Sequence, residues 1–179
     1  DASRFVSRAR YQLAWQAYRL GDLTDADSAG QQRRERFNEA LSGFSYFTST
    51  RQVKHPVVFD CFLGQSLCFH ELGRHDELIE SLEADFKIDE QLRGARADAS
   101  RRDSLRRMLY LLVKAYGKRA GTSPSTKLEA AAAKYFDFLR PTHEHDALDL
   151  EAAVIRAGNL HRLLEADSPA LKSMAASYR

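Results

Sequence analysis

Apolar and polar positions alternate along this chain with helical spacing, and the pattern is sharpest between Pro56 and Asp89. In the first half of this stretch, apolar or small residues recur at steps of three and four, as on one helical face: Phe59, Phe62, Ser66, Phe69 and Leu72. Gly73 interrupts the pattern, and glycine readily takes the left-handed conformation that ends a helix. The same spacing then resumes in a second set: Leu78, Ile79, Leu82 and Phe86. The stretch predicts two amphipathic helices joined by a tight turn at Gly73.

The residues on either side of this turn follow a known pattern of two aromatic residues, one small residue and two apolar residues: Phe62, Ser66, Phe69, Leu78 and Leu82. In this arrangement the stretch resembles the tetratricopeptide repeat (TPR), a pair of antiparallel helices about 34 residues long. Asp85 and Glu90 depart from the pattern, which usually has alanine and proline there. The resemblance implies stacked helix pairs, with the first helix of each pair lining a concave surface.

The remaining chain predicts further helices. Residues 3–20 form the first, with an apolar stripe of Phe5, Ala9, Leu13, Ala17 and Leu20, and Gly21-Asp22 is expected to end it. The later helices are expected from about Asp25 to Phe47, over 99–117, from Ser123-Pro124 to Leu139, over 148–163 and from Ser168 to near Tyr178. We therefore predict an all-α fold of seven or eight helices. They form a single TPR-like domain over 1–179, with helix pairs at about 3–48, 56–92, 99–140 and 145–178.

The helix over 25–47 ends in a dense apolar cluster: Phe37, Leu41, Phe44, Tyr46 and Phe47. Core packing beneath the next helix pair is the favoured interpretation, because aromatic residues at helical spacing usually face the interior. A ligand-facing aromatic patch is the alternative.

Charge adds a local contrast to this picture. Residues 76–90 carry seven acidic residues against one lysine, whereas residues 93–119 carry nine basic residues against Asp98 and Asp103. The Arg-rich segment is interpreted as a solvated helix face or as a surface for an acidic or phosphate-bearing partner. The net charge of +2 is too small to favour a nucleic-acid or membrane partner. The chain also lacks the run of about 18 apolar residues that a membrane-spanning helix needs.

Residues that could support catalysis are few. Cys61 and Cys68 are seven residues apart on one predicted helix, so they cannot bond to each other and are expected to be small buried residues. The segment THEHD (142–146) places two histidines near two acidic residues, but no further ligand is identifiable, and a capped turn is favoured over a metal site. Because no nucleophile, phosphate-binding or cofactor motif is present, we predict a non-catalytic protein without a cofactor.

The function expected from the resemblance is a scaffold that binds a protein or peptide. The basic residues on the inner helices favour an acidic partner. The candidate contact residues are the solvent-facing positions of those helices: Arg8, Gln12, Gln16, Arg19, Gln65, Arg102, Arg106 and Lys114. Nucleic-acid binding by the helix over 93–119, a metal-dependent activity at THEHD and self-association remain alternatives. The free thiols favour a reducing, cytoplasmic compartment. Because the chain begins with Asp1, we expect a fragment or a processed product, and export after signal removal stays open.

Overall fold

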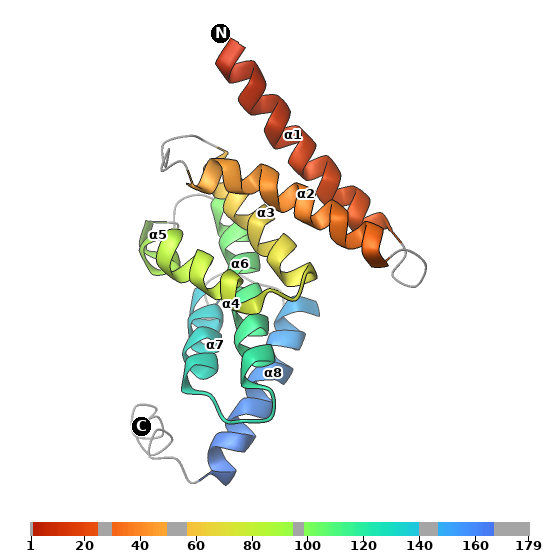
Figure 1. Cartoon of the computed structure of the whole chain (residues 1–179). Coiled ribbons are helices and arrows are strands. Elements are labelled where there is room, and N and C mark those ends of the chain that lie inside the picture. The colour runs from red at the N-terminus through yellow and green to blue at the C-terminus, as the bar shows by residue number, and fades with distance from the viewer. Residues whose placement is uncertain (1, 25–29, 50–56, 95–98, 140–146, 167–179) are drawn as a thin grey trace. The chain divides into compact units, whose positions relative to one another are not determined.

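A computed structural model of the chain describes residues 2–24, 30–49, 57–94, 99–139 and 147–166. These residues are helical and contain no β-strand, which confirms the all-α prediction (Figure 1). The helices are α1 (Ala2–Leu23), α2 (Gly30–Ser49), α3 (Val58–Glu71), α4 (His75–Glu80), the π-helical segment η1 (Ser81–Asp85), α5 (Ile88–Gly94), α6 (Ala99–Ala120), α7 (Thr126–Leu139) and α8 (Ala147–Glu165). The chain divides into two compact units, Asp1–Leu105 and Arg106–Arg179, and α6 contributes to both. That the whole chain is one repeat domain stays a prediction.

In the first unit, α2 packs against α1 and against α3, and α3 packs in turn against α4 and η1 (Figure 1). Glycines allow two of these close approaches. A Cβ atom at Gly43 of α2 would lie 2.7 Å from the Cβ of Ala14 in α1, and one at Gly64 of α3 would lie 2.5 Å from Cζ of Phe44 in α2. Both distances are shorter than real Cβ contacts, so each helix interface requires glycine at that position.

The turn after α3 is the one that the sequence predicts. Gly73 has φ of 71°, the Arg74 N–H donates to the Phe69 carbonyl at 2.8 Å, and the Gly73 N–H donates to the His70 carbonyl at 3.0 Å. This pair of bonds is a Schellman motif, which satisfies the last carbonyls of the helix. The helix expected to continue to about residue 92 is divided instead, because Lys87 has φ of 53° and separates η1 from α5.

The apolar cluster of α2 lies in the core as predicted, because Phe37, Leu41, Phe44 and Phe47 are buried, and only Tyr46 is exposed. The predicted start of this helix near Asp25 lies outside the described residues. The same holds for the predicted helix from Ser168 to Tyr178.

Two predictions for the first helix are wrong. Gly21 does not end the helix, since α1 continues to Leu23 and Gly21 faces the ring of Phe37. The stripe is also not buried as a whole: its members Leu13 and Leu20 are 62% and 50% exposed, whereas its member Ala17 is buried together with Ala14, which lies outside the stripe. Small side chains let α1 approach α2 closely, and the larger leucines therefore point away from it.

In the second unit, α6, α7 and α8 contact one another through buried side chains: α6 and α7 through the rings of Tyr110 and Tyr135, α6 and α8 through Arg106 and Asp149. Ser125 is the N-cap of α7, in place of the Ser123 predicted from Ser-Pro, because its Oγ accepts from the Leu128 N–H at 3.2 Å.

Candidate functional site

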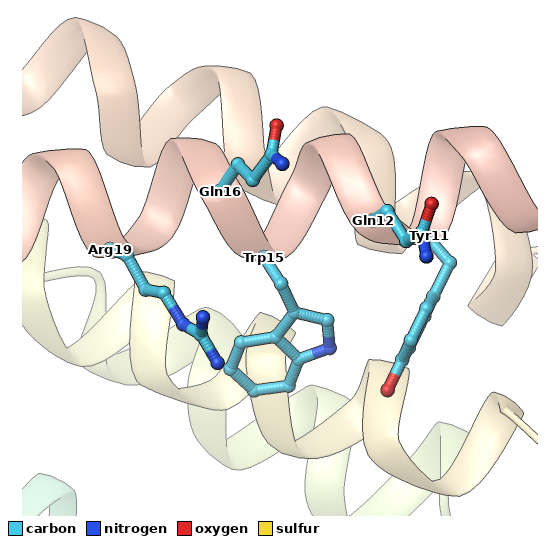
Figure 2. Close-up of a pocket in the computed structure, with 5 residues that line it drawn as sticks. All are labelled: Tyr11, Gln12, Trp15, Gln16 and Arg19. Atoms are coloured by element: carbon cyan, nitrogen blue, oxygen red, sulfur yellow. The ribbon is translucent and has the colours of Figure 1, made fainter.

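A groove of about 540 Å³ runs along α1 and is lined by five residues of that helix: Tyr11, Gln12, Trp15, Gln16 and Arg19 (Figure 2). Tyr11, Trp15 and Arg19 are four residues apart, so they lie on one face of the helix, and Figure 2 shows all three side chains pointing the same way. Gln12 and Gln16 form the adjacent edge. The groove therefore combines two aromatic rings, two amides and one guanidinium group.

Aromatic packing positions the two rings from beneath. The Trp15 ring meets Phe44 of α2 edge to face with centroids 5.0 Å apart, and it meets Tyr18 at 5.9 Å. Tyr11 contacts Phe47 and donates from its hydroxyl to Asp60 of α3 at 3.4 Å. Edge-to-face contacts of this kind add about 0.5–1.5 kcal/mol each to the burial of the rings. The groove thus lies on aromatic rings of α1 and α2, and Asp60 of α3 holds the Tyr11 hydroxyl.

The polar atoms of the groove are unequally satisfied. Burial, and then the Asp60 carboxylate, raise the pKa of Tyr11, and the indole N–H of Trp15 counteracts part of this rise. Trp15 Nε1 is buried, and its polar neighbour in the described part of the chain is Tyr11, although no hydrogen bond of good geometry joins the two side chains. The accessible polar groups of the groove are therefore the guanidinium of Arg19 and the amides of Gln12 and Gln16, which are exposed.

Four of the eight contact residues predicted from the sequence belong to this region. Arg8, Gln12, Gln16 and Arg19 are exposed on α1, and the last three line the groove. None of the described residues forms an ion pair with Arg19. The arginine can therefore meet a ligand carboxylate without first giving up a partner.

The solvent-facing prediction is wrong for two other residues. Gln65 is only 8% exposed, and its amide nitrogen donates to the Ser45 hydroxyl of α2 at 3.4 Å. Arg106 is 7% exposed and pairs with Asp149 at 3.1 Å. Both side chains are occupied inside the fold, because a polar residue at a packed position must find a buried partner.

The two remaining candidates are half-buried residues of α6. Arg102 belongs to the first unit and Lys114 to the second. Lys114 pairs with Glu151 of α8 at 3.1 Å. It also borders a smaller groove of about 310 Å³ in the second unit, which is lined by apolar, basic and acidic residues: Lys114, Gly117, Lys118, Glu151, Val154, Ile155, Gly158 and Arg162.

The buried polar groups of the second unit form a connected network. Asp149 accepts from Arg106 and from the hydroxyl of Tyr135, and all three side chains are buried. Burial and the hydrogen bond to Asp149 raise the pKa of Tyr135 above its ordinary value. Arg106 and Asp149 neutralise each other, and neither of the two grooves found in the described residues includes Asp149. The network therefore serves to hold α6, α7 and α8 together.

The candidates for chemistry are mostly structural. Cys61 and Cys68 are fully buried and free, as predicted, and burial raises the pKa of both thiols to about 12. Thiols so shielded are poor nucleophiles and poor metal ligands at neutral pH. No group of three or more His, Cys, Asp or Glu side chains is placed to hold a metal ion within the described ranges, and the THEHD segment lies outside them.

None of the helices in the described part of the chain is both long and apolar enough to cross a bilayer.

Sequence reasoning did not single out Tyr11 and Trp15, the two aromatic residues of the groove. Neither residue is among the predicted contact positions. The signal was their four-residue spacing with Arg19, which puts aromatic rings and a cation on one face.

Comparisons of the chain with protein-family models, with curated proteins and with solved structures give no match. The protein is all-α, and its helices pack against one another. The α1 groove is the feature from which a function is proposed.

Proposed function

We propose that this protein is a non-catalytic scaffold that binds an acidic peptide or peptide-like segment of a partner protein in the α1 groove. We further propose that its helix pairs stack in a TPR-like manner. Support for the stacking comes from the first unit, where consecutive helices pack in order and a glycine turn closes the pair α3–α4.

The observation that carries the proposal is the chemistry of the groove. Tyr11 and Trp15 offer the surfaces of two aromatic rings, and Arg19 lies four residues along the same face as Trp15. A peptide supplies apolar side chains for the rings and a carboxylate for the arginine at such a spacing. Gln12 and Gln16 add amide groups, which pair with peptide backbone through both their donors and their acceptor.

The Arg-rich segment gives less support to nucleic-acid binding. Arg106 is buried against Asp149, and the guanidinium of Arg101 stacks on Phe59 at 5.8 Å in the first unit. Nucleic-acid grooves present arginines to phosphates and aromatic rings to bases, whereas these arginines are engaged by protein groups.

The test uses Trp15, the only tryptophan of the chain, as a reporter located in the groove. Two synthetic peptides of about ten residues are titrated while the tryptophan emission is recorded. One contains Asp and Glu with interspersed Leu, and the other replaces each acid by its amide. Binding in the groove predicts an emission change with the acidic peptide and an affinity about tenfold lower for the amide peptide, because a charged hydrogen-bond partner contributes about 1.5–3 kcal/mol.

Arg19→Glu should abolish the preference for the acidic peptide. The matched control is Arg36→Glu, on the exposed side of α2, which should leave binding unchanged because Arg36 lies outside the groove. If the two reversals weaken acidic-peptide binding equally, the effect is one of net charge and the proposed groove is wrong.

A further inference from the structure

A second surface of α1 exposes large apolar side chains. Val6, Leu13, Leu20 and Leu23, called the Leu13 face below, are 49%, 62%, 50% and 82% exposed. They make up half of the exposed large apolar residues found in the described ranges. Val6, Leu13 and Leu20 recur every seven residues, which is the spacing of a seam between packed helices.

The Leu13 face is distinct from the α1 groove. Each residue of a helix is rotated by about 100° from the one before, so Leu13 and Trp15 lie on nearly opposite sides of α1. The groove uses Tyr11, Trp15 and Arg19, whereas none of its lining residues belongs to the Leu13 face. Arg19 lines the groove and also lies near Leu23, so it borders both surfaces.

The first unit itself shows what covers such a face. In the register that aligns Gly21 with Gly73, Val6 and Leu13 correspond to Val58 and Gln65 of α3. Val58 and Gln65 are buried, and Gln65 bonds to Ser45 of α2. The neighbouring Gly64 also lies against Phe44 of α2. In α3, therefore, this side packs on a helix, and in α1 the equivalent side is open in the described structure.

Charge defines the chemistry of the occupant. Arg10 lies one helical turn from both Val6 and Leu13, and Arg19 lies one turn from Leu23. Between Ala2 and Leu23 the helix carries four arginines and one acidic residue, Asp22. A second copy would bring two arginine-rich helices together, which like-charge repulsion opposes. An acidic helix would pair with the same arginines.

We infer that the Leu13 face binds an amphipathic α-helix of a partner protein, with an apolar stripe at heptad spacing flanked by Asp and Glu. From Val6 to Leu23 the face extends about 25 Å at 1.5 Å per residue, so the partner helix has roughly five turns. The leucines fill the seam, and the acids pair with Arg10, whose guanidinium lies over the ring of Tyr46 at 4.3 Å in the free chain. This inference does not depend on the α1 groove.

Two synthetic helical peptides of about 20 residues test the inference. Both carry Leu at the two seam positions of each heptad, and the flanking positions are Glu in one and Lys in the other. Binding to the wild-type chain is followed by fluorescence anisotropy of the labelled peptides at two salt concentrations. The Glu peptide is expected to bind at least about tenfold more tightly than the Lys peptide, and the difference should shrink at high salt.

Leu13→Asp should weaken the Glu peptide at least about tenfold, because it places a charge in the apolar seam. The matched control is Leu150→Asp, at a leucine of similar exposure (68%) in the second unit, which should leave affinity unchanged. Tyr11→Phe, which alters the groove on the opposite side of α1 without changing charge, should also leave it unchanged, so failure of the groove proposal and failure of this one are separable. Far-ultraviolet circular dichroism checks that each variant is folded.

Three results would overturn the inference. The first is equal binding of the Glu peptide to the wild-type chain and to Leu13→Asp. The second is equal binding of the Glu and Lys peptides. The third is a dimer of the wild-type chain in sedimentation velocity that Leu13→Asp converts to monomer, because the face would then be occupied by a second copy.

Discussion

The buried pair of Arg106 and Asp149 allows a quantitative prediction for the second unit. The two side chains are 8% and 3% exposed, and their charged atoms lie 3.1 Å apart. Asp149 also accepts from the Tyr135 hydroxyl, so its removal leaves two buried donors without this acceptor. We consider the substitution Asp149→Ala.

The expected loss is large relative to the stability of the unit. Removing one partner of a buried ion pair costs about 3–5 kcal/mol, because the other charge stays buried. A unit of about 70 residues has a free energy of unfolding of roughly 4–11 kcal/mol. With a urea dependence of about 1–3 kcal/mol per molar, the unfolding midpoint of the second unit should fall by at least about 1 M.

Two probes separate the units in this experiment. Circular dichroism at 222 nm reports helix in both, whereas emission of Trp15 reports the first unit alone. Asp149→Ala should shift the circular-dichroism transition to lower urea. The position of the Trp15 transition in the same samples then measures how far the unfolding of one unit is coupled to that of the other.

Control variants test the reasoning behind the magnitude. Glu77→Ala breaks the exposed pair with Arg74 on α4 and should cost at most about 1 kcal/mol, since solvent screens exposed pairs. The double variant Arg106→Met with Asp149→Leu should recover most of the loss, because it leaves no buried charge. The reasoning is refuted if Asp149→Ala and Glu77→Ala lower the midpoint equally, or if the double variant is less stable than Asp149→Ala.

Three further predictions concern packing, ionisation and capping. Gly64→Ala should lower stability by about 1–3 kcal/mol in thermal unfolding because its Cβ would meet Phe44, whereas Gly30→Ala, with no atom within 4 Å, should not; equal effects would contradict the close-approach argument. Burial raises the pKa of Cys61 and Cys68 from 9.0 to about 12, so only the unfolded chain releases these protons above pH 9. The thiol contribution to stability is thus complete below pH 9 and is lost by up to about 1.4 kcal/mol per pH unit per thiol as pH rises toward 12. Urea unfolding at pH 8 and 10 would measure this loss. A double alanine variant whose unfolding free energy falls equally between these pH values would exclude the thiols as its source. Asn159 is fully buried, and its side chain both donates to and accepts from the Ser125 backbone at 2.9 Å. Asn159→Ala should therefore cost about 1–3 kcal/mol of stability and increase amide exchange in the first turn of α7. Unchanged exchange there would show that these two hydrogen bonds do not stabilise the turn.

The parts of the fold that the sequence predicts are those in which local signals agree with packing. The α3–α4 pair has large apolar residues on its buried faces and a glycine at its turn, so periodicity and turn chemistry indicate the same structure. The burial of Phe37 and Phe44 follows from the same rule. These elements need no knowledge of residues distant in the sequence.

The buried polar residues could not be predicted in this way. Arg106 has the spacing of a solvent-facing residue, and its burial depends on Asp149, 43 positions away in the chain. Gln65 depends likewise on Ser45 across the α2–α3 interface. A single sequence gives the side-chain type and its helical face, but the partner that compensates burial is set by tertiary packing.

The candidate site was predicted in part for the same reason. The exposed polar residues of the α1 groove, Gln12, Gln16 and Arg19, follow from helical periodicity. The aromatic base does not, because α1 carries two apolar sets and periodicity alone cannot rank them. The set with small residues, Ala14 and Ala17, faces α2 because it allows the closer approach at Gly43.

That choice of face has an energetic consequence for α1. Full burial of a leucine gains about 1.5–3 kcal/mol, so Leu13 and Leu20, each at least half exposed, leave roughly 1 kcal/mol apiece unrealised in the free chain. The interface with α2 does not need these leucines, since Ala14, Ala17 and Trp15 make its contacts. Replacing them by polar residues should therefore leave the stability of the free chain unchanged while removing the gain available on association. A large apolar residue that does not contribute to the fold, repeated at seam spacing on a helix with four arginines, is better explained by a bound helix than by the packing of the chain itself.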